Sequence, residues 1–255
     1  MSSIKVAVVG STRETGASIV DGLLESPITK FFRQFPEVTA LARPESLEKQ
    51  AYMELKDRGV NVVAVDLKGP QDELVRILFG INVVISAIYF ASLADEIPLA
   101  DAAKRAGVRR FIQSAFMAVI PPRGVVDFRE KKEENLNYIQ KIRLPYTYID
   151  AGWWYQLTLP RLPYGRPDFA LPVYNSEPRL GVDGNVPSAL ADIRDIGGYV
   201  ARIISDPRTL NKKVHVYNEV YTGNQVYDLV EKLSGENLER KYITEGEIKS
   251  RVEEA

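Results

Sequence analysis

The sequence has no cysteine and a single histidine among its 255 residues. Without cysteine there is no disulfide framework, no thiol nucleophile and no thiolate metal site. One histidine cannot supply the two or three imidazoles that hold a catalytic zinc ion. We therefore expect no metal centre, and metal-dependent hydrolysis is a poor interpretation of this chain.

An excess of charge of either sign is also missing, since 33 Lys and Arg residues face 34 Asp and Glu residues, for a net charge of −1. Surfaces that bind nucleic acids depend on clustered cations, so we expect no nucleic-acid partner. No stretch approaches the roughly 20 consecutive apolar residues that a bilayer span requires. We expect a soluble, cytoplasmic protein without membrane contact, and whether it forms a homo-oligomer stays open.

Short runs rich in β-branched residues alternate with helix-length stretches from residue 4 to about residue 151. Several runs are almost continuously apolar, as is typical of strands that helices cover on both faces. This alternation predicts an α/β fold with a Rossmann-type, doubly wound parallel sheet. The expected strands are Ile4–Val9, Glu37–Leu41, Asn61–Val65, Asn82–Ser86, Arg110–Gln113 and Tyr146–Ile149.

The second part of the chain is less regular. Prolines cluster between Thr158 and Ser188, which predicts a stretch made mostly of loop. Helical patterns return at 193–204 and 225–233, with a short strand pattern at 213–217 between them. We expect a nucleotide-binding domain over residues 1–152 and a smaller α/β substrate-binding or cover region over residues 153–255, some of whose elements join the first domain.

The first strand runs into a glycine turn of the kind that binds dinucleotides in such folds. Gly10 would allow the sharp turn, Gly16 would let helix and strand approach, and the helix start would attract a pyrophosphate. Arg13 stands at the middle position, which normally lacks a side chain because the phosphates pass close to the backbone. The expected cofactor contacts here are Gly10, Ser11, Thr12, Arg13, Thr15 and Gly16. A turn without a nucleotide is the alternative.

Arg43 follows the second expected strand, where an arginine suits the 2′-phosphate of NADP and an acid would suit NAD. A guanidinium can bind such a dianion through two hydrogen bonds, although Arg43 could equally be a solvated loop charge. Asp66, after the third strand, would meet the adenine amino group or cap the next turn. Ser86 and Ala87, after the fourth strand, are further expected cofactor contacts.

Taken together, these stretches resemble the NmrA-like, isoflavone-reductase-like branch of the atypical short-chain dehydrogenases, particularly its fungal members. The similarity spans about residues 4 to 245 and adds to the glycine turn the stretches 66–69, 83–87, 106–111, 145–148 and 152–154. The resemblance implies a Rossmann-type domain that binds NADPH or NADP and a smaller C-terminal substrate region. It also implies either reduction of aromatic or unsaturated carbonyl metabolites or, in regulatory members, nucleotide sensing without turnover.

The resemblance implies a single catalytic lysine, and the position that matches it here is Lys132. The residue pattern agrees, because Phe128, Lys132, Leu136 and Ile139 share one face of a helix whose start Asp127 and Glu130 would cap. Burial lowers the pKa of a lysine ammonium toward the range useful for proton transfer. The alternative is a lysine whose stem covers apolar surface while its head reaches water.

Ligands of a doubly wound sheet bind beyond the carboxyl ends of the strands. Aromatic side chains are frequent at these ends and would clamp a flat, aromatic small molecule, although large aromatics also serve as packing residues. The expected substrate contacts are Tyr89, Phe90, Phe116, Met117, Trp153, Trp154 and Tyr155.

Three functions are compatible with these residues. The first is an NADPH-dependent reductase of an aromatic or unsaturated carbonyl metabolite, with Lys132 as the proton donor. The second is a regulatory protein that senses NADP(H) without turnover. The third, which follows if Arg13 blocks the pyrophosphate, is a non-redox isomerase, cyclase or dehydratase on the same scaffold.

Overall fold

The computed structural model describes residues 4–25, 37–165 and 179–254. Its internal contacts divide the chain into two compact units. Unit 1 comprises Met1–Asp150 and Arg194–Val216, and unit 2 comprises Ala151–Ile193 and Tyr217–Ala255. A helix and a strand from the C-terminal part of the chain therefore belong to the unit that carries the glycine turn.

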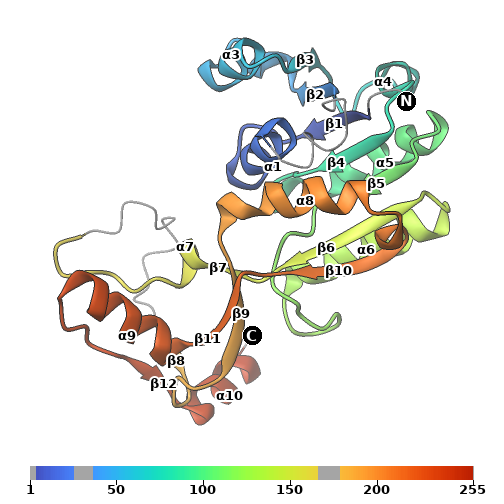
Figure 1. Cartoon of the computed structure of the whole chain (residues 1–255). Helices are drawn as coiled ribbons and strands as arrows, with labels where there is room; N and C mark the ends of the chain where they lie inside the picture. The colour runs from blue at the N-terminus through green and yellow to red at the C-terminus, as the bar shows by residue number, and fades with distance from the viewer. Residues whose placement is uncertain (1–3, 26–36, 166–178, 255) are drawn as a thin grey trace. The chain divides into compact units, whose positions relative to one another are not determined.

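Unit 1 is built on a seven-stranded sheet with the order β10-β6-β5-β4-β1-β2-β3 (Figure 1). The pairs β1–β2, β2–β3, β1–β4, β4–β5 and β5–β6 all run parallel. The chain leaves β1 toward β3 on one side and later returns toward β6 on the other, which confirms the doubly wound prediction. The strands are β1 (Lys5–Val9), β2 (Glu37–Ala42), β3 (Asn61–Ala64), β4 (Val83–Ser86), β5 (Arg110–Ile112), β6 (Tyr146–Ala151) and β10 (Lys212–Val216).

Helices flank this sheet in two groups (Figure 1). Helices α1 and α8 pack on each other, whereas α4, α5 and α6 form a separate row of neighbours. The helices of unit 1 are α1 (Glu14–Glu25), α3 (Gln50–Asp57), α4 (Gln71–Leu78), α5 (Glu96–Arg105), α6 (Asp127–Lys141) and α8 (Ile196–Ser205), with short 3₁₀ turns η1 (Pro44–Ser46), η2 (Phe90–Asp95), η3 (Ile193–Asp195) and η4 (Pro207–Thr209).

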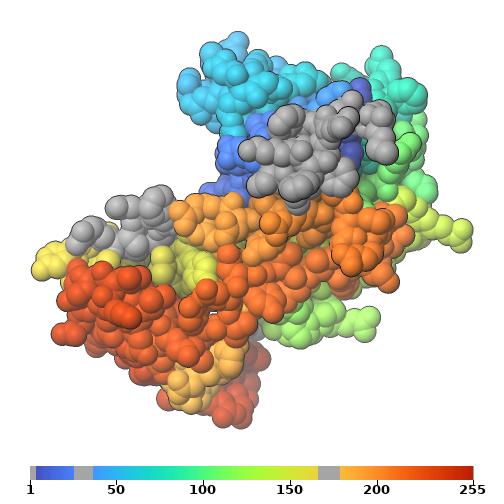
Figure 2. All heavy atoms as spheres, in the orientation of Figure 1, coloured from blue at the N-terminus to red at the C-terminus, as the bar shows by residue number. Residues whose placement is uncertain are grey.

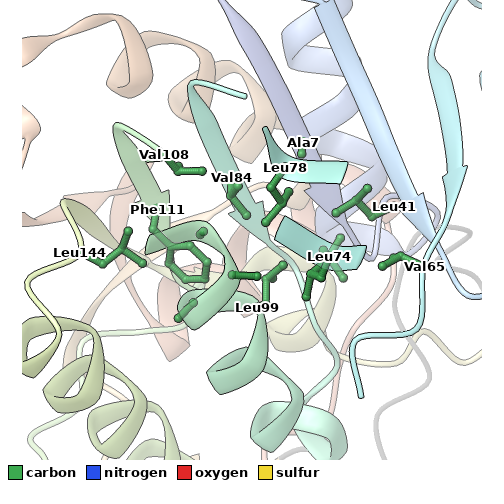
Figure 3. Packing of buried hydrophobic residues seen from close by; sticks show 14 of the residues in the cluster. Ala7, Leu41, Val65, Leu74, Leu78, Val84, Leu99, Val108, Phe111 and Leu144 are labelled. Carbon is green, nitrogen blue, oxygen red and sulfur yellow. The ribbon is translucent and has the colours of Figure 1, made fainter. Parts of the chain in front are cut away.

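The main apolar core lies between the sheet and the α4–α5–α6 row. Figure 3 shows Leu74 and Leu78 of α4 and Leu99 of α5 packed against side chains of the strands, among them Val84 and Phe111. All five of these side chains are buried. The apolar runs of β1 and β4 were predicted to be strands covered on both faces, and the structure confirms this.

Helices α1 and α8 approach closely at two glycines. A Cβ on Gly197 would stand 1.7 Å from the carbonyl oxygen of Ser18, and one on Gly22 would stand 2.1 Å from the carbonyl carbon of Gly197. The Ser18 hydroxyl donates to the Arg194 carbonyl at 3.0 Å and accepts from the Gly197 N–H at 3.0 Å. Figure 2 shows the orange surface of the α8 region bordering blue N-terminal atoms. This crossing holds α8 on the helix that follows the glycine turn.

Unit 2 contains a three-stranded sheet of order β11-β9-β7 and a two-stranded sheet of β12 and β8. Its elements are β7 (Trp153–Trp154), α7 (Tyr155–Thr158), β8 (Leu180–Gly181), β9 (Pro187–Ala191), β11 (Glu219–Thr222), α9 (Gly223–Ser234), β12 (Tyr242–Ile243) and α10 (Glu245–Glu253). Part of the expected proline-rich loop, residues 166–178, lies outside the described residues. None of the helices in the part of the chain that the structure describes has the length and apolar character needed to cross a bilayer.

The predicted capping of helix α6 was wrong. The helix begins at Asp127, its N-cap is Val126, and no side chain caps it. Glu130 instead accepts hydrogen bonds from the backbone N–H groups of Arg123 and Gly124, at 2.5 and 2.9 Å. The carboxylate that the pattern assigned to the helix start thus fastens the loop before the helix, where two consecutive residues have positive φ angles of 76° and 81°.

Candidate active site

The glycine turn brings β1, β4 and the start of α1 together. Gly10 has a φ of +78°, and a Cβ on it would stand 2.3 Å from the carbonyl oxygen of Ala87. A Cβ on Gly16 would stand 2.0 Å from the carbonyl oxygen of Gly10. Only glycine fits either position, because the obstacles are backbone atoms that cannot rotate away. The turn therefore lies at the switch point of the sheet, between the ends of β1 and β4, where doubly wound folds bind ligands.

Arg13 fits this turn without backbone strain. Arg13 does not have a positive φ, so its backbone conformation is open to any L-residue. Its side chain is exposed, and the guanidinium carbon lies 4.5 Å from the centroid of the Tyr89 ring, a cation–π contact. A Cβ at the middle position of the motif therefore leaves the turn intact, and whether Arg13 leaves room for a pyrophosphate stays a prediction.

The other residues of the turn also offer polar groups. Ser11 is fully buried, and its hydroxyl has no hydrogen-bond partner among the described residues. Thr12 and Thr15 are partly exposed. An orphaned buried hydroxyl usually costs stability unless a ligand or water satisfies it. The unpartnered hydroxyl of Ser11 is therefore suited to a bound polar group at this turn.

Arg43 and Asp66 lie after β2 and β3, as expected. Arg43 is exposed, and its Nε pairs with Glu45 at 3.3 Å, a surface contact worth little in water. The Asp66 carboxylate accepts from the backbone N–H of Lys68 at 2.9 Å, and the Gly69 N–H donates to the Asp66 carbonyl at 3.0 Å. Asp66 makes the turn contact that one interpretation expected of it, and its adenine contact stays a prediction.

Lys132 lies inside the protein. The residue is 6 % exposed, in contrast to the exposed Lys131 beside it, so the predicted inward face of α6 is confirmed for Lys132. Its Nζ donates hydrogen bonds to the carbonyl oxygens of Ser114 and Ala115 at 2.8 and 2.6 Å, in the segment that follows β5. The head group is therefore held by backbone and does not extend into water.

The surroundings of Lys132 set its protonation. Burial lowers the pKa of Lys132 from 10.5 to about 8, and the nearby Arg129 adds to this effect, whereas Glu96 and Asp150 oppose it. An amine with this pKa is present in both protonation states near neutral pH. That is the property that general acid–base catalysis requires of a lysine.

Asp150, near the end of β6, is a second perturbed group. It is 8 % exposed, and burial raises its pKa from 3.8 to about 6, although Arg129, Lys213 and Lys132 pull the pKa down. Tyr148, its neighbour on the same face of β6, has the Arg129 guanidinium carbon 5.4 Å and the Lys213 Nζ 5.3 Å from its ring centroid. The Arg129 guanidinium also pairs with Glu133 at 2.8 Å. A cluster of mixed charge therefore adjoins Lys132 in unit 1.

The Asp150→Asn variant should be more stable than the unmodified protein at about pH 8 and about equally stable at pH 4. The folded-state pKa of Asp150 lies above the unfolded value, so protonation of Asp150 stabilises the folded protein. This stabilisation is fully present below the unfolded pKa and is lost as pH rises through about 6. A shift of about two units corresponds to a gain of at most about 3 kcal/mol. Thermal unfolding at the two pH values measures it, and equal gains at both would contradict this cause.

The aromatic residues of unit 1 form a partly exposed row. The Tyr89 and Phe90 rings are 4.3 Å apart, and Phe90 lies 6.5 Å from Phe128, the second residue of α6. Tyr89 and Phe90 are both 46 % exposed, whereas Phe116 is buried and has a φ of +45°. Together with Arg13, the row connects the glycine turn to the helix that carries Lys132.

The other predicted substrate contacts are placed as follows. Met117 is partly buried in the segment after β5, while Trp153, Trp154 and Tyr155 belong to β7 and α7 of unit 2. Trp153 is 45 % exposed. Their part in substrate binding stays a prediction.

Three buried polar residues around Lys132 were not predicted from the sequence. Glu96 and Asn135 are buried beside Lys132, and the side-chain amide of Gln113 donates to the Lys132 carbonyl. Asn135 could have been found, because it lies three positions after Lys132 on the same helix face. Glu96 gave no such signal, since an acid in the first turn of a helix is usually solvated and interacts with the helix dipole.

Comparison with known proteins identifies the family of this chain. The NmrA-like family model matches residues 2–254. Asnovolin J 5′,6′-dehydrogenase of Aspergillus novofumigatus is 56% identical over 254 residues, which are 99% of this chain and 76% of that protein. An isoflavone reductase-like protein of Olea europaea is 28% identical over 265 residues, covering 98% of this chain and 81% of that protein.

Solved structures show the same fold. The structure described as AtPrR2 with NADP⁺ and (+)-pinoresinol superposes with a TM-score of 0.81 at 26% identity, covering 100% of this chain and 83% of that one. An isoflavone reductase gives a TM-score of 0.79 at 26% identity, with the same two coverages of 100% and 83%. The chain belongs to the NmrA-like family, and its relatives include isoflavone reductase-like proteins, as its motifs predicted.

Proposed function

We propose that this protein is an NADP(H)-dependent oxidoreductase that interconverts a small aromatic or unsaturated carbonyl metabolite and its reduced form. The single observation that carries the proposal is Lys132, a buried amine with a lowered pKa in the unit that also holds the glycine turn. The relatives support the reaction class and the cofactor, because they include a dehydrogenase, reductase-like proteins and a structure with NADP⁺.

The residues present fit this cofactor. The side-chain-free positions Gly10 and Gly16 and the unpartnered hydroxyl of Ser11 suit a pyrophosphate at the start of α1. Arg43 would hold the 2′-phosphate, since its ion pair with Glu45 is an exposed surface contact that a phosphate can replace. Arg13 would act as a second phosphate clamp once its guanidinium leaves the Tyr89 ring. Thr12, Thr15, Asp66, Ser86 and Ala87 complete the proposed contacts.

When bound, NADP(H) supplies or accepts the hydride, and the protein must handle the accompanying proton. A lysine ammonium has three N–H groups, and two of those of Lys132 are donated to Ser114 and Ala115. The third remains for a substrate oxygen. When the third N–H gives its proton to the substrate, the nitrogen lone pair takes the place of that proton. Lys132 would therefore act as an acid in reduction and as a base in dehydrogenation.

The substrate class rests on the aromatic residues. Tyr89 and Phe90 are half-exposed on unit 1. Trp153, Trp154 and Tyr155 belong to unit 2, and their role as substrate contacts stays a prediction. Flat, conjugated molecules pack well on such rings. Phe116 and Met117 would line the site next to the Ser114–Ala115 cradle, the pair of backbone carbonyls that binds the Lys132 ammonium. The conjugated carbonyl oxygen is the substrate group that Lys132 would protonate or polarise.

The test is to follow nicotinamide absorbance while the protein is offered cyclic enones and aromatic carbonyl compounds with NADPH, and their saturated counterparts with NADP⁺. We expect turnover with at least one pair, and deuterium from C4-labelled NADPH should appear on a substrate carbon. Conversion of a substrate without any nucleotide would instead identify a non-redox enzyme. Tight nucleotide binding with no turnover across the panel would favour a sensor.

A further inference from the structure

Glu96 is an acid in the interior of unit 1. It is the first residue of α5 and is fully buried. Its Oε1 accepts the backbone N–H of Ser114 at 2.6 Å, and its Oε2 accepts the side-chain amide of Asn135 at 2.9 Å. A buried carboxylate is costly and is retained only where specific hydrogen bonds and charges compensate for its lost hydration.

Both of these partners belong to the surroundings of Lys132. Ser114 gives its N–H to Glu96 and its carbonyl oxygen to the Lys132 ammonium, which lies 2.8 Å away. Asn135 follows Lys132 by three positions on α6, and its amide also donates to the Leu93 carbonyl in η2 at 2.9 Å. One carboxylate thus fastens the backbone cradle of Lys132 and the face of the helix that carries it.

The charges of Glu96 and Lys132 depend on each other. Burial raises the pKa of Glu96 above 4.5, while the hydrogen bonds from Ser114 and Asn135 and the charge of Lys132 counteract this rise. Glu96 in turn opposes the lowering of the Lys132 pKa, as does Asp150, whereas Arg129 adds to the lowering. Removing the negative charge of Glu96 should therefore make the ammonium easier to deprotonate.

We propose that Glu96 is a positioning residue. It holds the Ser114–Ala115 cradle in place against helix α6, and it controls how readily Lys132 gains and loses its proton. The inference rests on the proposed function only in assigning a catalytic use to that proton. Glu96 does not touch substrate or cofactor in this account and acts through Lys132.

The test measures the protonation of Lys132 directly. In protein with ¹³C-labelled lysine side chains, the signal of Lys132 is the one that disappears in Lys132→Met, and its pH titration gives the pKa without cofactor or substrate. In Glu96→Gln we expect this pKa to fall by about one unit or more, a tenfold change in the ionisation constant. Glu96→Asp, which keeps the charge, should recover at least half of the shift.

The control is Glu134→Gln, which removes the same charge from an exposed position on α6 and should leave the titration of Lys132 unchanged. A folded Glu96→Gln protein in which Lys132 titrates as in the unmodified protein would overturn the proposal. If Glu96→Gln does not fold, Asn135→Leu decides, because it withdraws one donor from the carboxylate; the Lys132 pKa should fall here too, and an unchanged pKa overturns the proposal.

Kinetics then separate this inference from the proposed function. With an active substrate, the pH profile of kcat/KM should shift to lower pH in Glu96→Gln by the same amount as the Lys132 titration. A shifted titration with no turnover in the unmodified protein would contradict the proposed reaction while leaving the coupling of Glu96 to Lys132 established.

Discussion

Replacing Lys132 with methionine should lower kcat for the favoured substrate by about 10²- to 10⁴-fold, the usual contribution of a positioned acid–base group. Methionine has nearly the length of the lysine stem, but it cannot donate to the carbonyls of Ser114 and Ala115 or transfer a proton. The affinity for NADPH should change by less than about threefold, because the expected phosphate contacts lie on other elements. Steady-state rates and a nucleotide titration measure the two effects.

The matched control is Lys131→Met, which removes the same charge one position earlier on α6. Lys131 is exposed, and kcat should stay within about twofold of the unmodified value. If Lys132→Met retained full activity, or if Lys131→Met lost activity to the same extent, Lys132 would not be the proton-transferring group. The second outcome would point to the net charge of the helix.

Of the substitutions that add one methyl group to a glycine of unit 1, Gly197→Ala should be the most destabilising. Its Cβ would stand 1.7 Å from the carbonyl oxygen of Ser18, so helices α1 and α8 must separate. Overpacking against backbone costs about 3 kcal/mol or more, since no side chain can rotate away. For a protein whose unfolding free energy is typically about 5–15 kcal/mol, that loss is large. Chemical denaturation measures it.

Gly198→Ala supplies the control from the next position of the same helix. A Cβ there meets nothing within 4 Å, so alanine should raise the free energy of unfolding by up to about 1 kcal/mol through its higher helix propensity. Equal effects of the two substitutions would show that the α1–α8 crossing is looser than the structure describes it.

The fold could be predicted because its signals are local. Continuous apolar runs such as Val83–Ser86 identify strands that are covered on both faces, and the glycine turn marks the chain reversal after β1. Helical spacing placed Lys132 on the apolar face of its helix, and the resemblance favoured a buried head group over one that reaches water. These features depend on neighbours within a few residues, so a single sequence discloses them.

The parts that failed or were missed depend either on the conformation of a loop or on contacts between distant segments. Glu130 was assigned to the start of α6, yet its partners are the N–H groups of Arg123 and Gly124, whose loop conformation the sequence does not specify. Glu96 reaches Asn135 across 39 positions. Arg13 was unexpected in the motif, and the turn accommodates its backbone while its guanidinium contacts the Tyr89 ring, 76 positions away. A single sequence does not disclose which distant residue a charged side chain will contact.

Calorimetric titration of NADPH and NADH into the unmodified protein and into Arg43→Ala tests whether the glycine turn and Arg43 hold NADP(H). We predict micromolar affinity for NADPH, at least about tenfold weaker binding of NADH, and loss of most of that difference in Arg43→Ala, because a guanidinium–phosphate contact is worth about 1.5–3 kcal/mol. Absence of NADPH binding, or equal affinity for the two nucleotides in the unmodified protein, would contradict the account.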